Sequence, residues 1–110
     1  MLEIRKRPQV VRDLIDIATY IANTNLDQSD RFLQSAEATF QNLAKMPGIG
    51  KRCQFHNSQL KNIRQAGVKN FKKYLVFYRA SEHSIEIIRV IHGSRDLENL
   101  RTEKNEDKTD

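Results

Sequence analysis

The strongest strand-forming segments of the chain are Tyr74-Leu75-Val76-Phe77-Tyr78 and Ile85-Glu86-Ile87-Ile88-Arg89-Val90-Ile91. β-Branched and aromatic residues dominate both segments, which is typical of β-strands. The polar residues 81–84 between them predict a turn, so the two strands should form an antiparallel hairpin. We expect the cross-strand neighbours to be Arg79 and Glu86, Ala80 and Ile85, Phe77 and Ile88, and Leu75 and Val90.

This register distributes the side chains over two largely apolar faces. One face should carry Tyr74, Val76 and Tyr78 together with Ile85, Ile87, Arg89 and Ile91. Two further strands are predicted before the hairpin, at residues 60–68 and, in a shorter form, at residues 2–5. The hairpin is therefore part of a larger sheet.

An amphipathic helix is predicted over residues 8–23. Pro8 suits the first helical turn, where its missing N–H costs nothing. Apolar residues from Val11 to Ala22 recur at the spacing of one helical face. Asp13 and Asp16 are expected on the opposite side, in solvent.

A second helix is expected after a short polar break. Its apolar stripe runs from Phe32 to Ala44, Asp27 or Ser29 is the expected N-terminal cap, and Met46-Pro47-Gly48 ends it. A short connector makes the two helices antiparallel neighbours. The element order is β-α-α-β-β-β, an α+β fold in which a helical hairpin covers one face of a small, mostly antiparallel sheet. Residues 48–59 are expected to form a loop.

Length and composition indicate one globular domain at residues 1–101 with a polar tail at 102–110 that is expected to be disordered. Cys53 is the only cysteine, so an internal disulfide is excluded. No apolar run approaches the roughly 20 residues of a membrane span, and the N-terminus lacks the apolar segment of a signal peptide. We therefore expect a cytoplasmic protein that does not enter a membrane.

The charge of +5, from 19 basic and 14 acidic residues, is unevenly placed. Residues 38–81 contain no Asp or Glu. They hold nine basic residues: Lys45, Lys51, Arg52, Lys61, Arg64, Lys69, Lys72, Lys73 and Arg79. A block of this kind creates a positive potential that attracts nucleic acid or an acidic protein, although it could also be an ordinary solvated surface.

Metal and cofactor sites find little support. Cys53 and His56 form half of a zinc site, and no second ligand pair accompanies them. The glycines near Lys51 lack the spacing of a phosphate-binding loop. No metal and no cofactor are therefore expected.

A group of cations remains on the predicted strands: Arg64, Arg79, Arg89, His92 and Arg95. These residues could hold a phosphodiester, with His92 transferring a proton during RNA cleavage. They could equally be structural, with Arg79 paired to Glu86, Arg89 lying across a sheet face and His92 ending a strand. A single titratable residue leaves either the acid or the base role unfilled, which favours the structural interpretation of His92.

The segments at residues 68–79 and 87–97 resemble the RelE/ParE toxin superfamily, most closely its ParE branch. The most recognisable parts are the Tyr-Leu-Val-Phe-Tyr-Arg strand and the later Arg-Val-Ile-His-Gly-Ser-Arg-Asp run. Looser agreement follows upstream at Arg31-Phe32-Leu33, Met46-Pro47-Gly48-Ile49-Gly50 and Ile63-Arg64. The resemblance covers about residues 2–100.

The resemblance implies the toxin of a type II toxin-antitoxin module of the plasmid-stabilisation kind, neutralised by an acidic antitoxin. ParE proteins inhibit DNA gyrase and are not nucleases, whereas RelE relatives cleave mRNA at the ribosome. RelE-like nucleases carry several cations and a Tyr or His near the chain end on the open sheet face. This chain has no Tyr after Tyr78, so the ParE interpretation is preferred. The nuclease alternative would use Arg64, Arg79, Arg89 and His92.

A surface for the antitoxin or the target is expected on the part of the sheet that the helices leave open. Its predicted contact residues are Arg52, Arg64, Lys73, Arg79, Arg89 and Arg95. Apolar side chains of an acidic segment would lie on the sheet, and its carboxylates on the arginines. DNA would be contacted only through the antitoxin complex, and a homodimer through the open face is the alternative use of this surface.

Overall fold

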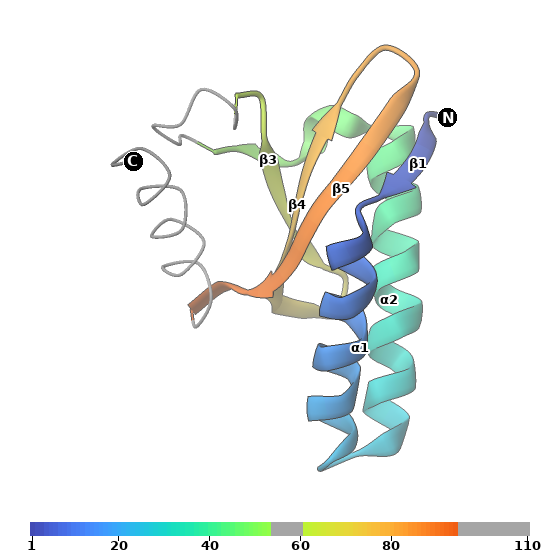
Figure 1. Cartoon of the computed structure of the whole chain (residues 1–110), viewed down its shortest axis with the longest axis vertical. Helices are drawn as coiled ribbons and strands as arrows, with labels where there is room; N and C mark the ends of the chain where they lie inside the picture. Colours follow the sequence, from blue (N-terminus) through green and yellow to red (C-terminus); the bar gives the residue numbers. More distant parts are fainter. Residues whose placement is uncertain (54–60, 95–110) are drawn as a thin grey trace.

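The computed structural model describes residues 1–53 and 61–94 as a five-stranded mixed sheet with two helices on one face (Figure 1). The elements are β1 (Glu3–Lys6), α1 (Pro8–Ala22), α2 (Leu26–Lys45), the 3₁₀ turn η1 (Pro47–Ile49), β2 (Lys51–Arg52), β3 (Arg64–Val68), β4 (Phe71–Ala80) and β5 (Ser84–His92). The strand order is β1-β5-β4-β3-β2. β1 runs parallel to β5 and the other neighbours are antiparallel. The predicted α+β fold is confirmed.

The observed strands differ from expectation mainly in the region before β4. The strand predicted over 60–68 begins at Arg64, and β2 lies inside the segment expected to be a loop. β2 forms because Lys51 and Arg52 pair with β3, a contact that local sequence does not reveal. Residues 54–60 and the tail at 102–110 lie outside the described residues. None of the described helices is long and apolar enough to cross a membrane.

The two helices form an antiparallel hairpin (Figure 1). The prediction of the second N-cap was wrong, because α2 begins at Leu26 and places Asn25 at the cap position. The Asn25 side chain accepts a hydrogen bond from the Gln28 N–H at 3.1 Å. Ser29 instead donates its hydroxyl to the Ala18 carbonyl at 2.7 Å and so joins the two helices.

The main core lies between the helices and the sheet. Phe32 and Phe40 of α2 are fully buried against Val76 and Tyr78 of β4 and against β5. The Phe32 ring meets the Tyr74 ring edge to face at a centroid distance of 5.2 Å. Burial of each large apolar side chain contributes about 1.5–3 kcal/mol, so this layer provides most of the packing energy.

The hairpin register changes at a β-bulge between Phe77 and Tyr78. Arg79 faces Glu86 and Ala80 faces Ile85 as predicted. Beyond the bulge Phe77 faces Arg89 and Leu75 faces Ile91, so the expected partners Ile88 and Val90 were wrong. An extra residue in one strand shifts all later pairs by one position.

The bulge also changes which face some side chains occupy. Val90 joins the core beneath the helices, whereas Ile91 packs with Phe77, Ile88 and Ile63 in a second apolar cluster. Ile91 therefore lies on the opposite face from the one predicted. All four residues of this second cluster are buried, so the expectation of a bare sheet face is not met there.

Candidate binding surface

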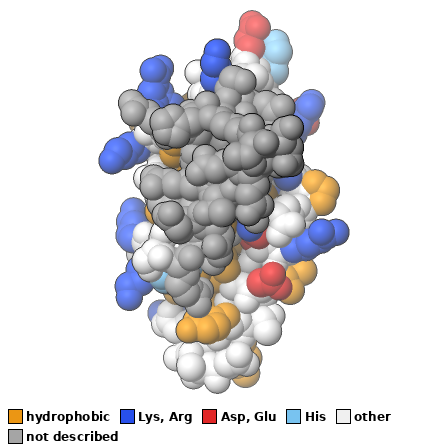
Figure 2. Space-filling model, turned by 60° about the vertical axis from the view of Figure 1, so that its left-hand side comes forward, with side chains coloured by type: hydrophobic (Ala, Val, Ile, Leu, Met, Phe, Trp, Pro, Cys, Tyr) orange, Lys and Arg blue, Asp and Glu red, His pale blue; other side chains and the backbone are white. Residues whose placement is uncertain are grey.

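Basic residues gather at the β2 edge of the sheet. Arg52 of β2 lies opposite Arg64 of β3, and Lys51 lies opposite Gln65. Lys51 and Arg52 are both exposed. In Figure 2, Lys and Arg side chains line the left-hand edge of the molecule. Two arginines in directly opposed positions concentrate positive charge where an acidic group can reach them.

Arg64 is anchored on the turn that follows α2. Its Nη1 donates to the Gly50 carbonyl at 2.7 Å and approaches the Gly48 carbonyl at 3.4 Å. Carbonyl oxygens accept these bonds without neutralising the guanidinium. Arg64 therefore keeps its positive charge while holding the backbone that leads into β2.

Tyr78 fastens the same turn from the core side. Its hydroxyl donates to the Pro47 carbonyl at 2.7 Å and accepts from the Gly50 N–H at 2.9 Å. Burial raises the pKa of Tyr78 above its ordinary value of 10.0, and the Gly50 N–H and Arg64 only partly oppose this effect. The phenol thus remains a neutral structural group.

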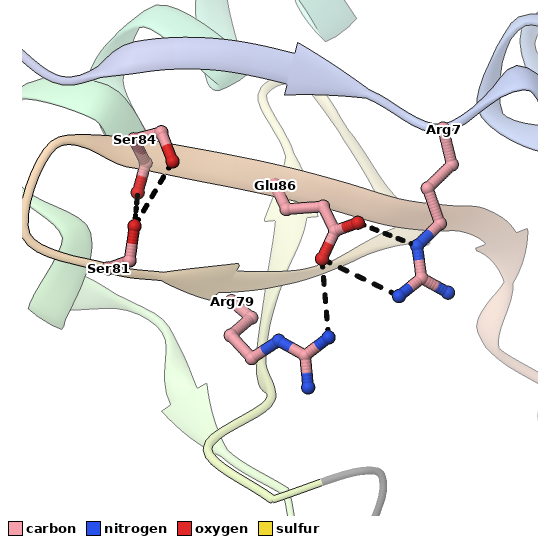
Figure 3. A network of polar contacts seen from close by, with 5 residues as sticks. All are labelled: Arg7, Arg79, Ser81, Ser84 and Glu86. Carbon is pink, nitrogen blue, oxygen red and sulfur yellow. Dashed lines mark hydrogen bonds and ion pairs between the residues drawn. The ribbon is translucent and has the colours of Figure 1, made fainter.

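Arg79 belongs to a charge network across three neighbouring segments (Figure 3). Its Nη2 lies 3.3 Å from Glu86 Oε1, and Arg7 Nε lies 2.9 Å from Glu86 Oε2. The Arg7 hydrogen bond, supported by Arg79, holds the pKa of Glu86 below its ordinary value of 4.5 against the opposing effect of burial. The predicted Arg79–Glu86 pair is present, and the network retains one net positive charge.

Arg89 pairs with Asp13 of α1. Arg89 Nε lies 2.9 Å from Asp13 Oδ2 and Nη2 lies 3.2 Å from Oδ1. The same carboxylate accepts from the Val90 N–H at 3.0 Å and from Gln9 Nε2 at 3.0 Å. The prediction that Asp13 faces solvent was wrong, because Asp13 is only 6% exposed beside Val10 and Ile17 on the buried side of α1.

His92 and Lys73 lie on β5 and β4, away from β2. His92 is half-buried, its Nδ1 is 3.0 Å from the Ser94 hydroxyl, and its ring meets Tyr74 at 5.2 Å. Tyr74 faces His92 and Tyr78 faces Arg64, so His92 and Arg64 are separated by four β4 residues, roughly 13 Å along the strand. Lys73 is exposed on β4, and Arg95 lies outside the described residues.

The four residues of the nuclease alternative therefore do not converge within the described structure. Arg64 donates a hydrogen bond to a backbone carbonyl. Arg79 forms an ion pair with Glu86, and Arg89 forms one with the buried Asp13. No group of three or more potential metal ligands occurs among residues 1–53 and 61–94. Sequence reasoning missed Asp13 and Tyr78, although Asp13 follows the apolar Val10 by three residues and could have been placed on the buried stripe.

Comparison with known proteins gives one matching family and a solved structure of similar fold. The model of a family described as "ParE toxin of type II toxin-antitoxin system, parDE" matches residues 4–97. A solved structure titled "Chromosomal ParDE TA system from P. aeruginosa" superimposes with a TM-score of 0.64 at 15% identity. The match covers 84% of this chain and 96% of that chain. The search of curated proteins found no match.

Proposed function

This chain belongs to the ParE toxin family of type II toxin-antitoxin systems, and from that premise we propose that it inhibits DNA gyrase in the cytoplasm until a cognate antitoxin neutralises it. The family match over residues 4–97 supports the toxin role. The fold shared with a ParDE toxin-antitoxin structure supports an antitoxin partner. Action through binding, without a chemical step, is the simplest function for a chain whose described residues form no convergent catalytic group.

The observation that favours gyrase over RNA as the target is that the strand arginines Arg64, Arg79 and Arg89 are bound to groups of this chain itself. Arg79 forms an ion pair with Glu86 and Arg89 forms one with Asp13. Arg64 donates to a backbone carbonyl. Cleavage of RNA needs cations and proton-transfer groups directed at one phosphodiester. The described residues distribute these cations over separate places, which supports a binding protein over a nuclease.

A supercoiling assay tests this proposal. Purified chain is added in increasing amounts to gyrase and relaxed plasmid, and we expect supercoiling to be inhibited. Preincubation with the cognate antitoxin should restore activity. Full gyrase activity at a large excess of toxin would contradict the proposal.

A cellular experiment separates the two targets. Inhibition of gyrase should produce filamentous cells with DNA damage, while protein synthesis continues at first. The alternative, cleavage of mRNA by Arg64, Arg79, Arg89 and His92, should stop protein synthesis at once and leave cut messages. Immediate arrest of translation would favour the nuclease.

The β2 edge is the best candidate for antitoxin binding. β2 covers only Arg64 and Gln65 of β3, so within the described residues the rest of β3 lacks a neighbouring strand on that side. An extended acidic segment could bond to this strand edge and place carboxylates near Arg52. Exposed Arg52 would contact the segment directly, whereas Arg64 would also position the turn beside it.

A further inference from the structure

The outer side of α1 carries an apolar pair that the core does not use. Val11 is 50% exposed and Ile15 is 58% exposed, and they are one helical turn apart. Arg12 and Asp16 lie beside this pair, are also one turn apart and are both exposed. Neither forms an ion pair among residues 1–53 and 61–94. Two apolar and two charged side chains thus form one solvent-facing stripe.

α2 adds one exposed apolar residue, Leu33, beside the middle of the α1 stripe. The Ser29–Ala18 hydrogen bond sets the register of the antiparallel helices, which are side by side in Figure 1. Counting one turn from that bond in each helix brings Leu33 level with Leu14 and Ile15. Leu33 is 38% exposed. The hairpin patch, defined as Val11, Arg12, Ile15, Asp16 and Leu33, therefore has an apolar centre.

We propose that this hairpin patch binds a second copy of the same chain, with the two α1 helices antiparallel about a twofold axis. An axis midway between the levels of residues 13 and 14 brings Val11 of each copy to within one residue, about 1.5 Å along the helix, of the level of Ile15 of the other. The same axis brings Arg12 of each copy to within the same small offset of Asp16 of the other, which side chains of this length can span. Each apolar residue then meets an apolar residue and each charge meets its opposite, as a self-complementary twofold contact requires.

The charge pattern selects a second copy over an acidic or a basic partner. An acidic segment would place its carboxylates against Asp16, and a basic one would place its cations against Arg12. Only a partner with both signs at one-turn spacing and reversed direction satisfies both residues. The patch is small, so the dimer is weak and concentration-dependent. It uses the helical layer and leaves the β2 edge free, so it does not depend on the proposed function.

Charge exchange at the patch provides the test. Sedimentation velocity over a concentration series should show a monomer–dimer equilibrium for the unmodified chain. Arg12→Asp alone and Asp16→Arg alone should each raise the dimer dissociation constant by about tenfold or more, because like charges then face one another. The double variant Arg12→Asp/Asp16→Arg should return to within about threefold of the unmodified chain. Arg31→Asp, an exposed change on α2 outside the patch, should leave the constant unchanged.

A mixture of the two single variants separates binding from folding. Arg12→Asp carries two acidic residues at the patch and Asp16→Arg carries two basic ones, so the mixture should form heterodimers although each variant alone is monomeric. Restored association also shows that both variants are folded. A monomeric unmodified chain at every concentration, or a mixture that stays monomeric, would overturn the proposal.

Discussion

Asp13 shows how one buried carboxylate can join a helix to a sheet. It accepts hydrogen bonds from Gln9 within α1 and from Arg89 and the Val90 N–H in β5. A buried charge is costly unless its oxygens are fully bonded, and these donors satisfy both oxygens. The position therefore contributes to docking of α1 rather than to solubility.

Removal of this carboxylate should be strongly destabilising. Asp13→Ala leaves the Val90 N–H and the Arg89 guanidinium without their acceptor, so we expect a loss of about 3 kcal/mol in the free energy of unfolding. Urea denaturation measures the loss. Asp30→Ala, at an exposed position of α2, is the matched control and should change stability by less than about 0.5 kcal/mol. Equal effects of the two substitutions would contradict the assigned role of Asp13.

Gly50 is a second position where a single atom matters. A Cβ at Gly50 would lie 2.2 Å from the Tyr78 hydroxyl oxygen, and Tyr78 is fully buried and cannot move aside. A Cβ at Gly48 would meet nothing within 4 Å. The two glycines therefore have different roles although they are two residues apart.

Alanine substitution should separate these two glycines. Gly50→Ala would force the new methyl group against the Tyr78 ring and disrupt the hydrogen bonds of the Tyr78 hydroxyl with Pro47 and Gly50, with an expected destabilisation of about 2 kcal/mol or more. Gly48→Ala should stay within about 0.5 kcal/mol of the unmodified chain. Thermal and urea unfolding of both variants provide the measurement, and a stable Gly50→Ala chain would disprove the contact.

At the scale of elements, the hairpin of β4 and β5 is linked to the start of α1 by Glu86. This carboxylate binds Arg79 of β4 and Arg7, the residue before α1 (Figure 3). β1 runs parallel to β5, and at Arg7 the chain turns out of the sheet to begin α1, which continues in the same general direction across the sheet face (Figure 1). Glu86 stabilises that turn by its ion pair with Arg7.

This network predicts a pH dependence with a definite sign. The pKa of Glu86 is lower in the folded chain than its ordinary value of 4.5, so its stabilisation is complete above pH 4.5 and is lost as the pH falls through the lower folded-state pKa. Glu86→Gln should therefore destabilise the chain at pH 7 by less than about 1 kcal/mol, because the pair is partly exposed. At pH 3 the difference in unfolding free energy should shrink. A Glu86→Gln difference that stays constant between pH 7 and pH 3 would contradict the assignment.

For the whole molecule, the acid-free block at residues 38–81 contributes Lys51, Arg52 and Arg64 to the β2 edge of the sheet. Lys51→Glu/Arg52→Glu should weaken binding of the cognate antitoxin by about tenfold and reduce the salt dependence of its affinity. Calorimetric titration at two salt concentrations measures both effects. Arg31→Glu on α2 is the matched control, and equal losses from both changes would remove the β2 edge from the interface.

Much of the molecule follows from local patterns. The apolar periodicity of the helices, the β-branched strands and the polar turn at 81–84 depend on neighbouring residues, so the element order and α+β class could be predicted. The strand motifs also carry the family resemblance, which the match over residues 4–97 confirms. The acid-free block likewise predicts a positive surface, because its nine cations have no Asp or Glu within the block to neutralise them.

Long-range contacts required the folded chain. The bulge at Phe77 and Tyr78 changed the partner of Leu75 and the face of Ile91, since strand register is set by how whole faces pack. Asp13 binds Arg89, and Arg64 donates to Gly50. These partners are far apart in the sequence, so local residue spacing does not predict the contacts. Tertiary packing therefore determined which charges are held by internal partners and which remain available to another protein.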